Sequence, residues 1–169
     1  MTDTLNAGTS TGKVHAAHPA YKASDKVASH LQQLLVDVSE LALQAKQAHW
    51  NVVGRNFRDL HLQLDEIVEA ARGFTDDVAE RMRAVYAVPD ARSATVAANT
   101  TLAPFPAGEV STGATVDLMA ASLYAVAATG RRIHDDVDEE DPTTADLIHT
   151  ILERIEQLAW MVDAENRTV

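Results

Sequence analysis

The stretch from Lys46 to Glu80 constrains this chain most strongly, because it places metal-ligand residue types on otherwise apolar helical faces. The residues from 57 to 85 have apolar side chains at steps of three and four, which predicts one long amphipathic helix. The ligand types are two imidazoles and three carboxylates: His49, His61, Asp65, Asp76 and Glu80. Four of them belong to the predicted helix 57–85, and His49 lies near the end of the helix before it.

Helix geometry puts these four residues on one face. With His61 at zero, Asp65 lies at about 40°, Asp76 at about 60° and Glu80 at about 100°. Asp65 and Asp76 are nevertheless about 16 Å apart along the axis, and His61 and Glu80 about 28 Å, whereas metal–ligand bonds are only about 2 Å long. Either the helix carries two poor half-sites, or two copies lie antiparallel across a two-fold axis and form two complete sites. His49 can add a ligand at the His61 end.

The donor set favours iron, manganese or zinc over copper(I). Charges on a long helix often belong to a solvated face, and Arg72 on the same face could neutralise a carboxylate without any metal. Five ligand types on facing stripes favour the metal interpretation. The paired E-x-x-H signature of di-iron bundles is absent, and Asp146-Leu-Ile-His149 is interpreted as a helix cap followed by an interface or surface histidine.

Composition and charge limit the class of protein. The chain has 169 residues, 46% hydrophobic and 5% aromatic, which fits one helical domain. The formal charge of −11 repels free nucleic acid and attracts cations. Cysteine is absent, which excludes thiolate metal sites and disulfides. No apolar run is long enough for a membrane span and no signal peptide is evident, so we expect a cytoplasmic protein, with nucleoid association left open.

We expect a four-helix bundle. Residues 1–23 are interpreted as a flexible tail and 24–169 as one domain. Helices are predicted over about 25–52 with Ser24 as cap, 57–85 with Asn56 as cap, 114–138, and 145–166 with Thr143 or Thr144 as cap. The connection 86–112 is long, contains a predicted short helix over 91–99, and indicates a crossover along the bundle.

The motif HWNVVGRNFRDLHLQLDE, followed by the D-x-x-x-E of Asp76 and Glu80, resembles the Dps family, the ferritin-like DNA-binding proteins from starved cells. The resemblance covers about residues 24–166, including the last helix. It implies an all-α ferritin-like bundle with a short helix in the crossover, assembled as a hollow dodecamer. It also implies an inter-subunit ferroxidase site with His49, His61 and Asp65 from one chain and Asp76 and Glu80 from its neighbour, and with Trp50 beside it or simply packed at a helix end.

The same resemblance implies a function in oxidative stress. Members oxidise Fe²⁺ with hydrogen peroxide or O₂ and store ferric mineral in the cage. The acidic run 135–142 is interpreted either as a solvated helix end or as carboxylates around three-fold pores, with Asp141 and Asp146, and then Glu139 and Glu140, as candidates.

DNA binding is expected to be weak or absent. The cations available to a tail are few, mainly Lys13, Lys22, Lys26 and Arg167, and each phosphate contact needs one. Two other functions compete with iron storage: metal-assisted hydrolysis of an amide or ester at the His/carboxylate site, and a structural protein that compacts DNA. The sequence provides no clear substrate pocket for the first and a poor basic tail for the second.

Overall fold

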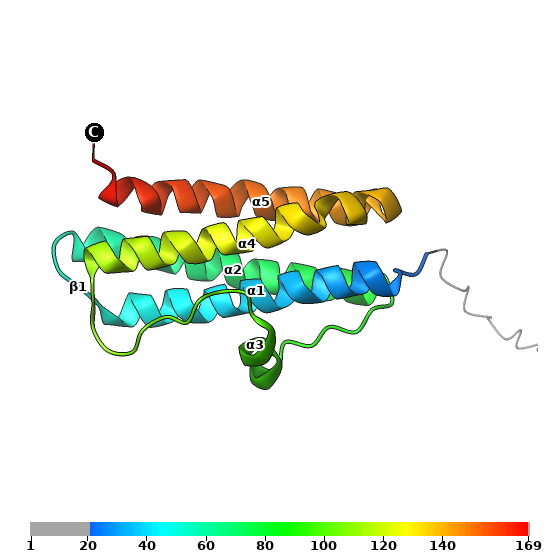
Figure 1. The fold of residues 1–169 in the computed structure, drawn as a ribbon, viewed down its shortest axis with the longest axis horizontal. Coiled ribbons are helices and arrows are strands. Elements are labelled where there is room, and N and C mark those ends of the chain that lie inside the picture. Colours follow the sequence, from blue (N-terminus) through cyan, green and yellow to red (C-terminus); the bar gives the residue numbers. More distant parts are fainter. Residues whose placement is uncertain (1–20, 169) are drawn as a thin grey trace, which may run out of the picture.

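The structure is a computed structural model that describes residues 21–168, and it is a bundle of four long helices. The long helices are α1 (Asp25–Asn51), α2 (Phe57–Ala84), α4 (Thr112–Glu140) and α5 (Pro142–Asp163). A short helix, α3 (Ser93–Asn99), lies in the connection between α2 and α4, and a 3₁₀ turn, η1 (Ala164–Asn166), follows α5. Figure 1 shows the four long helices side by side, with α3 outside the bundle next to α1.

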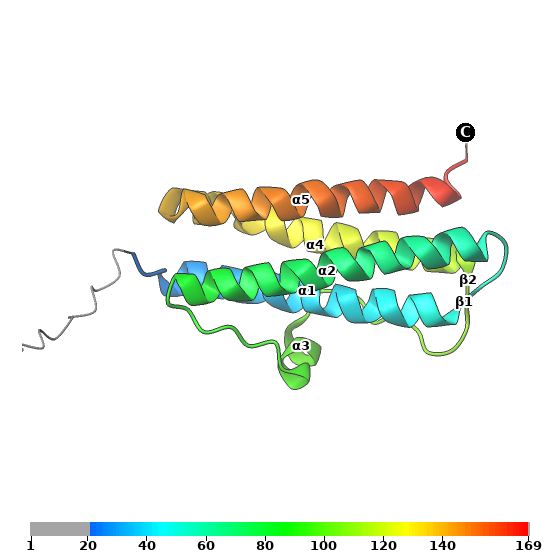
Figure 2. The same cartoon turned by 180° about the vertical axis from the view of Figure 1, so that it is seen from behind.

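Two antiparallel hairpins, α1–α2 and α4–α5, form the bundle, and a crossover joins them. Because the crossover returns along the whole bundle, α2 and α4 run in the same direction (Figures 1 and 2). Two short strands, β1 (Val52–Val53) and β2 (Val110–Ser111), pair in parallel at the end where α1 turns into α2. This pairing ties the end of the crossover to the α1–α2 turn, which is where the predicted ligand residues begin.

The helix ends follow local chemistry. Ser24 accepts a hydrogen bond from the Val27 amide, as predicted, and Ser111 does the same for Ala114 at the start of α4. The α1–α2 turn contains Gly54 at a φ of +129°, which side-chain-bearing residues rarely adopt. A Cβ there would also lie 3.0 Å from the Thr112 hydroxyl. Glycine therefore allows α4 to start directly against this turn.

The predicted apolar stripes form one continuous core. Leu31, Leu34, Leu64, Ile67 and Met119 are fully buried, and most other stripe positions are buried with them. Burial of this apolar area is the main favourable term in folding. The predicted fold class, a ferritin-like four-helix bundle with a short helix in the crossover, is confirmed.

Polar side chains of α1 hold the crossover against the bundle. Gln32 exchanges hydrogen bonds with the backbone of Asp90, at 2.8 and 2.9 Å. Gln33 donates to the carbonyl of Asn99 at 3.0 Å. Asp37 is completely buried and accepts hydrogen bonds from the backbone amide and the hydroxyl of Thr101, at 2.8 and 2.9 Å. These contacts satisfy backbone groups of a segment that has little secondary structure of its own.

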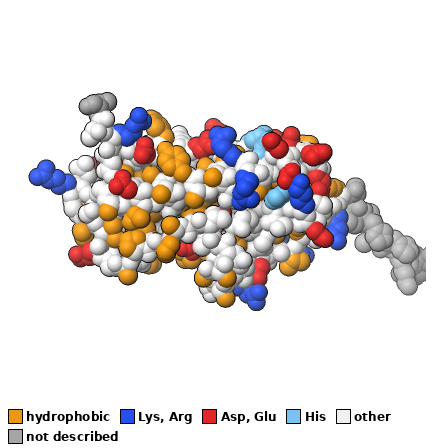
Figure 3. Space-filling model, in the orientation of Figure 1, with side chains coloured by type: hydrophobic (Ala, Val, Ile, Leu, Met, Phe, Trp, Pro, Cys, Tyr) orange, Lys and Arg blue, Asp and Glu red, His pale blue; other side chains and the backbone are white. Residues whose placement is uncertain are grey.

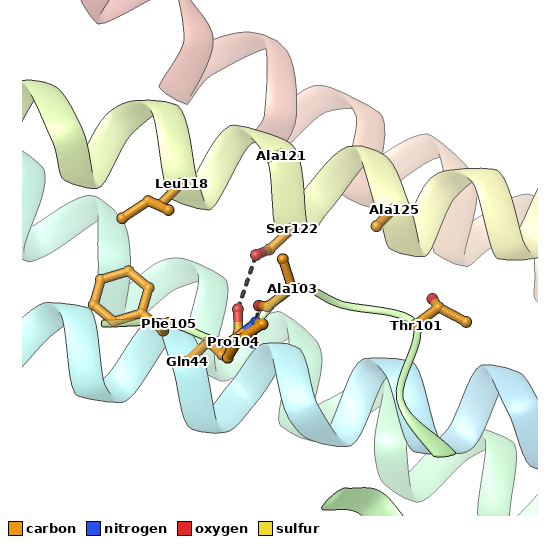
Figure 4. A pocket seen from close by; sticks show the side chains of 9 residues that line it. All are labelled: Gln44, Thr101, Ala103, Pro104, Phe105, Leu118, Ala121, Ser122 and Ala125. Atoms are coloured by element: carbon orange, nitrogen blue, oxygen red, sulfur yellow. Dashed lines mark hydrogen bonds between the residues drawn. The ribbon is translucent and has the colours of Figure 1, made fainter. Parts of the chain in front are cut away.

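Gln44 lies about two helical turns after Asp37, on the same side of α1. Its amide donates to the carbonyl of Ala103 at 2.9 Å and accepts from the Ser122 hydroxyl of α4 at 2.8 Å (Figure 4). Beside it, Pro104, Phe105 and α4 side chains line a hollow of about 220 Å³. The crossover is thus fixed to α1 and α4 together.

Several local predictions need correction. Asn56 adopts a left-handed conformation and its side chain does not cap α2. Helix α4 is longer than predicted at both ends, and α5 begins at Pro142, with Asp141 and not Thr143 or Thr144 in the cap position. Proline at the first helical position costs no hydrogen bond, because that amide has no intrahelical acceptor. Phe57, the first apolar residue of the predicted amphipathic helix 57–85, is 43% exposed and lies outside the core.

The predicted flexible tail lies mostly outside the described residues. Of its last three residues, Tyr21 donates to Glu140 at 2.9 Å and the Ala23 amide donates to the Val85 carbonyl at 3.0 Å, so the chain contacts the bundle before α1 begins. Among residues 21–168, no helix has the length and apolarity needed to cross a membrane.

We predict that Asp37→Ala destabilises the protein by about 1–3 kcal/mol, because buried donors from the crossover and α4 lose their acceptor. Thr129 of α4 also donates to Asp37, at 2.8 Å, so the substitution leaves donors on both the crossover and α4 without an acceptor. Denaturant unfolding measures the change, with Asp138→Ala on the exposed surface of α4 as the control. Equal midpoints for the two variants would contradict this role for Asp37.

Candidate metal centre

His49 and His61 form a reciprocal pair at the junction of α1 and α2. The Nδ1 of His49 donates to the carbonyl of His61 at 3.0 Å, and the Nδ1 of His61 donates to the carbonyl of His49 at 2.9 Å. The rings stack with centroids 3.7 Å apart. Because a carbonyl oxygen can only accept, each Nδ1 carries a hydrogen, and each neutral ring keeps its lone pair on Nε2. Both imidazoles are therefore held in a tautomer that can bind a metal.

Local folding explains this arrangement. His49 lies in the last turn of α1, where backbone carbonyls have no partner inside the helix. His61 lies in the second turn of α2 and satisfies the His49 carbonyl across the short turn. His49 is only 8% exposed. The centroid of the Phe57 ring lies 5.1 Å from that of His61.

Asp65 lies beside the two histidines and is paired with a lysine. Lys46 donates to its Oδ1 at 2.6 Å, and the Nδ1 of His49 is 3.3 Å from the same oxygen. The hydrogen bond from Lys46 lowers the pKa of Asp65 more than partial burial raises it, and the imidazole of His49 adds to the lowering. Asp65 is therefore a carboxylate at neutral pH and attracts cations.

Lys46 was missed by the sequence reasoning. It precedes His49 by three residues, so one helical turn puts both side chains on the same face of α1. Its ammonium also lies 6.0 Å from the centroid of the Trp50 ring, which is 69% exposed. Trp50 thus lies next to the predicted ligands through Lys46, and does not pack inside the bundle.

Asp76 and Glu80 are not part of this cluster. Both are exposed on α2 and lie several turns beyond Asp65, because α2 is continuous from Phe57 to Ala84. Within residues 21–168, no three His, Asp or Glu side chains of one chain are placed to hold a metal ion. One chain brings His49, His61 and Asp65 close together without arranging them around an ion, and it leaves the other two predicted ligands apart. That all five ligate one centre stays a prediction.

The four predicted pore residues have different surroundings. Asp141 is 9% exposed and pairs with Arg81 at 2.5 Å, and it also accepts from the Thr144 hydroxyl. Burial by itself would raise the pKa of Asp141, but the hydrogen bonds from Thr144 and Arg81 hold it below its usual range. The carboxyl group of Asp141 fixes the α4–α5 junction to α2. This is a structural contact that the sequence did not reveal.

Glu140 also holds the residues just before α1 against the end of α4. It accepts from the Ser24 amide at 2.7 Å and from the Tyr21 hydroxyl, and the first of these bonds lowers the pKa of Glu140. Burial, followed by the bond to Glu140, raises the pKa of Tyr21 to about 12. Asp146 and Glu139 are exposed. The pore prediction depends on an assembly and stays a prediction, and these two carboxylates are the more accessible candidates.

Comparison with known proteins identifies the class. A family model described as a ferritin-like domain matches residues 28–168. DNA protection during starvation protein 2 of Deinococcus radiodurans is 37% identical over 137 residues, which cover 79% of this chain and 56% of that protein. DNA protection during starvation protein of Mycolicibacterium smegmatis is 30% identical over 143 residues, covering 85% and 78%.

A solved structure agrees. Dps from Microbacterium arborescens in the high iron form superimposes with a TM-score of 0.77 at 31% identity, over 86% of this chain and 98% of that one. The fold and the matches define a ferritin-like protein. The chain belongs to the Dps family, which confirms the resemblance inferred from the HWN motif. It spans just over half the length of the Deinococcus relative.

We predict that Asp141→Asn lowers stability at pH 7 by about 1.5–3 kcal/mol, because it weakens charged hydrogen bonds at a buried position. The folded-state pKa lies below the unfolded value of about 3.9. The stabilisation is therefore present above that pH and is lost as pH falls through the folded-state pKa. Thermal unfolding between pH 7 and 3 tests this, with exposed Asp146→Asn as the control. A difference that stayed constant down to pH 3 would contradict the assigned charge.

Proposed function

We propose that this protein oxidises Fe²⁺ with hydrogen peroxide, or with O₂, at sites shared between two chains, and stores the ferric product in a hollow dodecamer in the cytoplasm. The observation that carries the proposal is the reciprocal His49–His61 pair, which leaves both Nε2 lone pairs free, with the Asp65 carboxylate 3.3 Å from the Nδ1 of His49. Dps proteins generally oxidise and store iron, and a similar protein was solved in a high iron form.

The shared site follows from the length of α2. Asp76 and Glu80 lie about 16–28 Å from the His61 and Asp65 positions along this helix, so they cannot bind the same ion within one chain. An antiparallel second copy would bring its own Asp76 and Glu80 to the first copy's histidines. The α1–α2 hairpin also keeps the large apolar side chains Leu43, Trp50 and Leu62 exposed. Exposed apolar side chains on the two helices that bear the ligands suit an interface between copies.

In this proposal iron is the substrate, and each group of residues has a separate role in binding and oxidising it. The imidazoles and the Asp65 carboxylate bind Fe²⁺, and the neighbour's carboxylates complete its ligands. Each peroxide takes up two electrons, one from each of two Fe²⁺ ions, and its O–O bond breaks to give two hydroxides. Carboxylates stabilise Fe³⁺ more than Fe²⁺ because they are hard anionic ligands. They therefore lower the barrier to the electron transfer.

We expect DNA binding to contribute little to the function of this protein. The names of the relatives refer to DNA protection, but the net charge here is −11 and phosphate contacts need clustered cations. Protection of DNA would follow indirectly, because removing Fe²⁺ and peroxide together removes the reactants that produce hydroxyl radicals.

We predict that His61→Ala and Glu80→Ala each oxidise Fe²⁺ poorly, and that mixed assemblies of the two recover part of the activity. A mixed pair of chains contains one intact site, made of one chain's Glu80 and the other's His61. Anaerobic Fe²⁺ titration followed by peroxide, monitored by ferric absorbance, measures this. Asp77→Ala, next to the ligands and exposed on α2, is the matched control and should retain activity.

The assemblies must be unfolded and refolded together so that chains mix, and each variant refolded alone gives the baseline. Absence of recovery in the mixed sample would contradict a site shared between chains. Full activity of both single variants would contradict the ligand assignment itself.

We predict that Lys46→Met strengthens Fe²⁺ binding about two- to fivefold, because the lysine ammonium competes with the metal ion for Asp65. Lys26 forms an equivalent ion pair with Asp136 at 2.7 Å, far from the candidate centre in the fold. Lys26→Met is therefore the matched control for loss of a paired lysine. Anaerobic Fe²⁺ titration measures the affinity, and unchanged or weaker binding by Lys46→Met would contradict the competition.

A further inference from the structure

A second histidine pair lies between α4 and α5. The Nε2 atoms of His134 and His149 are 2.6 Å apart, and their ring centroids are 4.5 Å apart. Together with Arg131 and Asp135 they line a shallow depression of about 190 Å³. Histidine side chains reach the surface over this hairpin among acidic and basic groups (Figure 3). The proposed iron site uses neither residue.

A carboxylate lies next to the Nδ1 of each ring. The Nδ1 of His134 donates to Asp135 at 2.9 Å, so this nitrogen carries a hydrogen and the lone pair of a neutral ring lies on Nε2. The Nδ1 of His149 lies 3.6 Å from Asp146, within the range of an ion pair. A carboxylate behind an imidazole fixes its orientation and makes Nε2 a better ligand, as it does at many metal centres.

The short contact between the two Nε2 atoms requires a shared hydrogen. His134 supplies the lone pair, so the hydrogen belongs to the Nε2 of His149. A metal ion that binds both rings takes the place of this hydrogen, which moves to the Nδ1 of His149, 3.6 Å from Asp146. Two bonds of about 2.0–2.1 Å in a tetrahedral site need the nitrogens about 3.3 Å apart. The rings must therefore separate by about 0.7 Å, which His149 allows because its side chain is 58% exposed.

The surrounding charges are compatible with a dication. Arg131 is the cation in the depression, and Glu156 neutralises it through two hydrogen bonds, at 2.5 and 2.8 Å. Asp135 on α4 and Asp146 on α5 contribute two negative charges behind the imidazoles. The local field of these carboxylates therefore favours the binding of a dication.

We propose that His134 and His149 form a two-histidine site for a borderline divalent ion such as Zn²⁺, with water as the remaining ligands. Neutral imidazoles favour Zn²⁺, Ni²⁺ or Cu²⁺ over Mg²⁺ or Ca²⁺. The site differs from the proposed iron centre, because its carboxylates orient the imidazoles and do not bind the metal directly. It does not depend on the proposed function.

Zn²⁺ titration of the full-length apoprotein by calorimetry tests the site. His149→Gln and His134→Gln should each bind one Zn²⁺ per chain at least tenfold more weakly than the unsubstituted protein. In ¹H–¹⁵N spectra of the histidine rings, Zn²⁺ should shift the Nε2 signals of His134 and His149.

Three controls separate this site from other imidazoles. His30→Gln removes a histidine that pairs with Asp136, and the pair His15→Gln/His18→Gln removes the two near the N-terminus. His61→Ala disables the proposed iron site. All three should keep the Zn²⁺ ion assigned to His134 and His149.

Unchanged Zn²⁺ binding by His149→Gln would overturn the proposal, as would a loss of this Zn²⁺ ion in His61→Ala alone. Circular dichroism checks that the variants fold. Because His149 is exposed, its variant decides the matter even if His134→Gln perturbs the bundle.

Discussion

The carboxyl group of Asp37 is the contact on which the arrangement of the two hairpins depends. It is completely buried and joins α1 to the crossover at Thr101 and to α4 at Thr129. A long connection without regular structure must find partners for its backbone groups, and the row Gln32, Gln33, Asp37 and Gln44 supplies them along α1. With the crossover fixed in this way, α4 starts beside the α1–α2 turn, and β1 can pair with β2.

This arrangement separates two kinds of histidine chemistry. At the α1–α2 turn, His49 and His61 lie beside a carboxylate that can itself bind the metal ion. Between α4 and α5, the carboxylates lie behind His134 and His149 and orient the rings. Hard anionic ligands favour iron that must become ferric, whereas imidazoles without a carboxylate ligand favour borderline ions such as Zn²⁺. One bundle thus offers two environments that differ in where the negative charge lies.

The sequence predicted what depends on periodicity and local motifs. The apolar stripes predicted four helices, and Ser24 predicted the start of α1. It did not predict contacts between residues far apart in the chain. Asp37 and Gln44 have the appearance of ordinary polar residues of α1, but both are buried and bind residues about 60 positions later in the chain. Asp141 belongs to an acidic run that looks solvated, and only the fold brings Arg81 to it. For Lys46, the helical spacing of three residues is by itself enough to place the side chain on the same face of α1 as His49.

For the candidate centre, residue types and helix length were accessible from sequence, but the protonation of the rings was not. That property depends on which atom each Nδ1 meets. At His49 and His61 both partners are backbone carbonyls, which can only accept, so both Nε2 lone pairs are free before a metal ion arrives. At His134 and His149 the two Nε2 atoms meet each other, so the hydrogen between them must move to the Nδ1 of His149 before a metal ion can bind both rings. The backbone geometry of the α1–α2 turn thus prepares the first pair for immediate binding, whereas the second pair must first change the tautomer of His149.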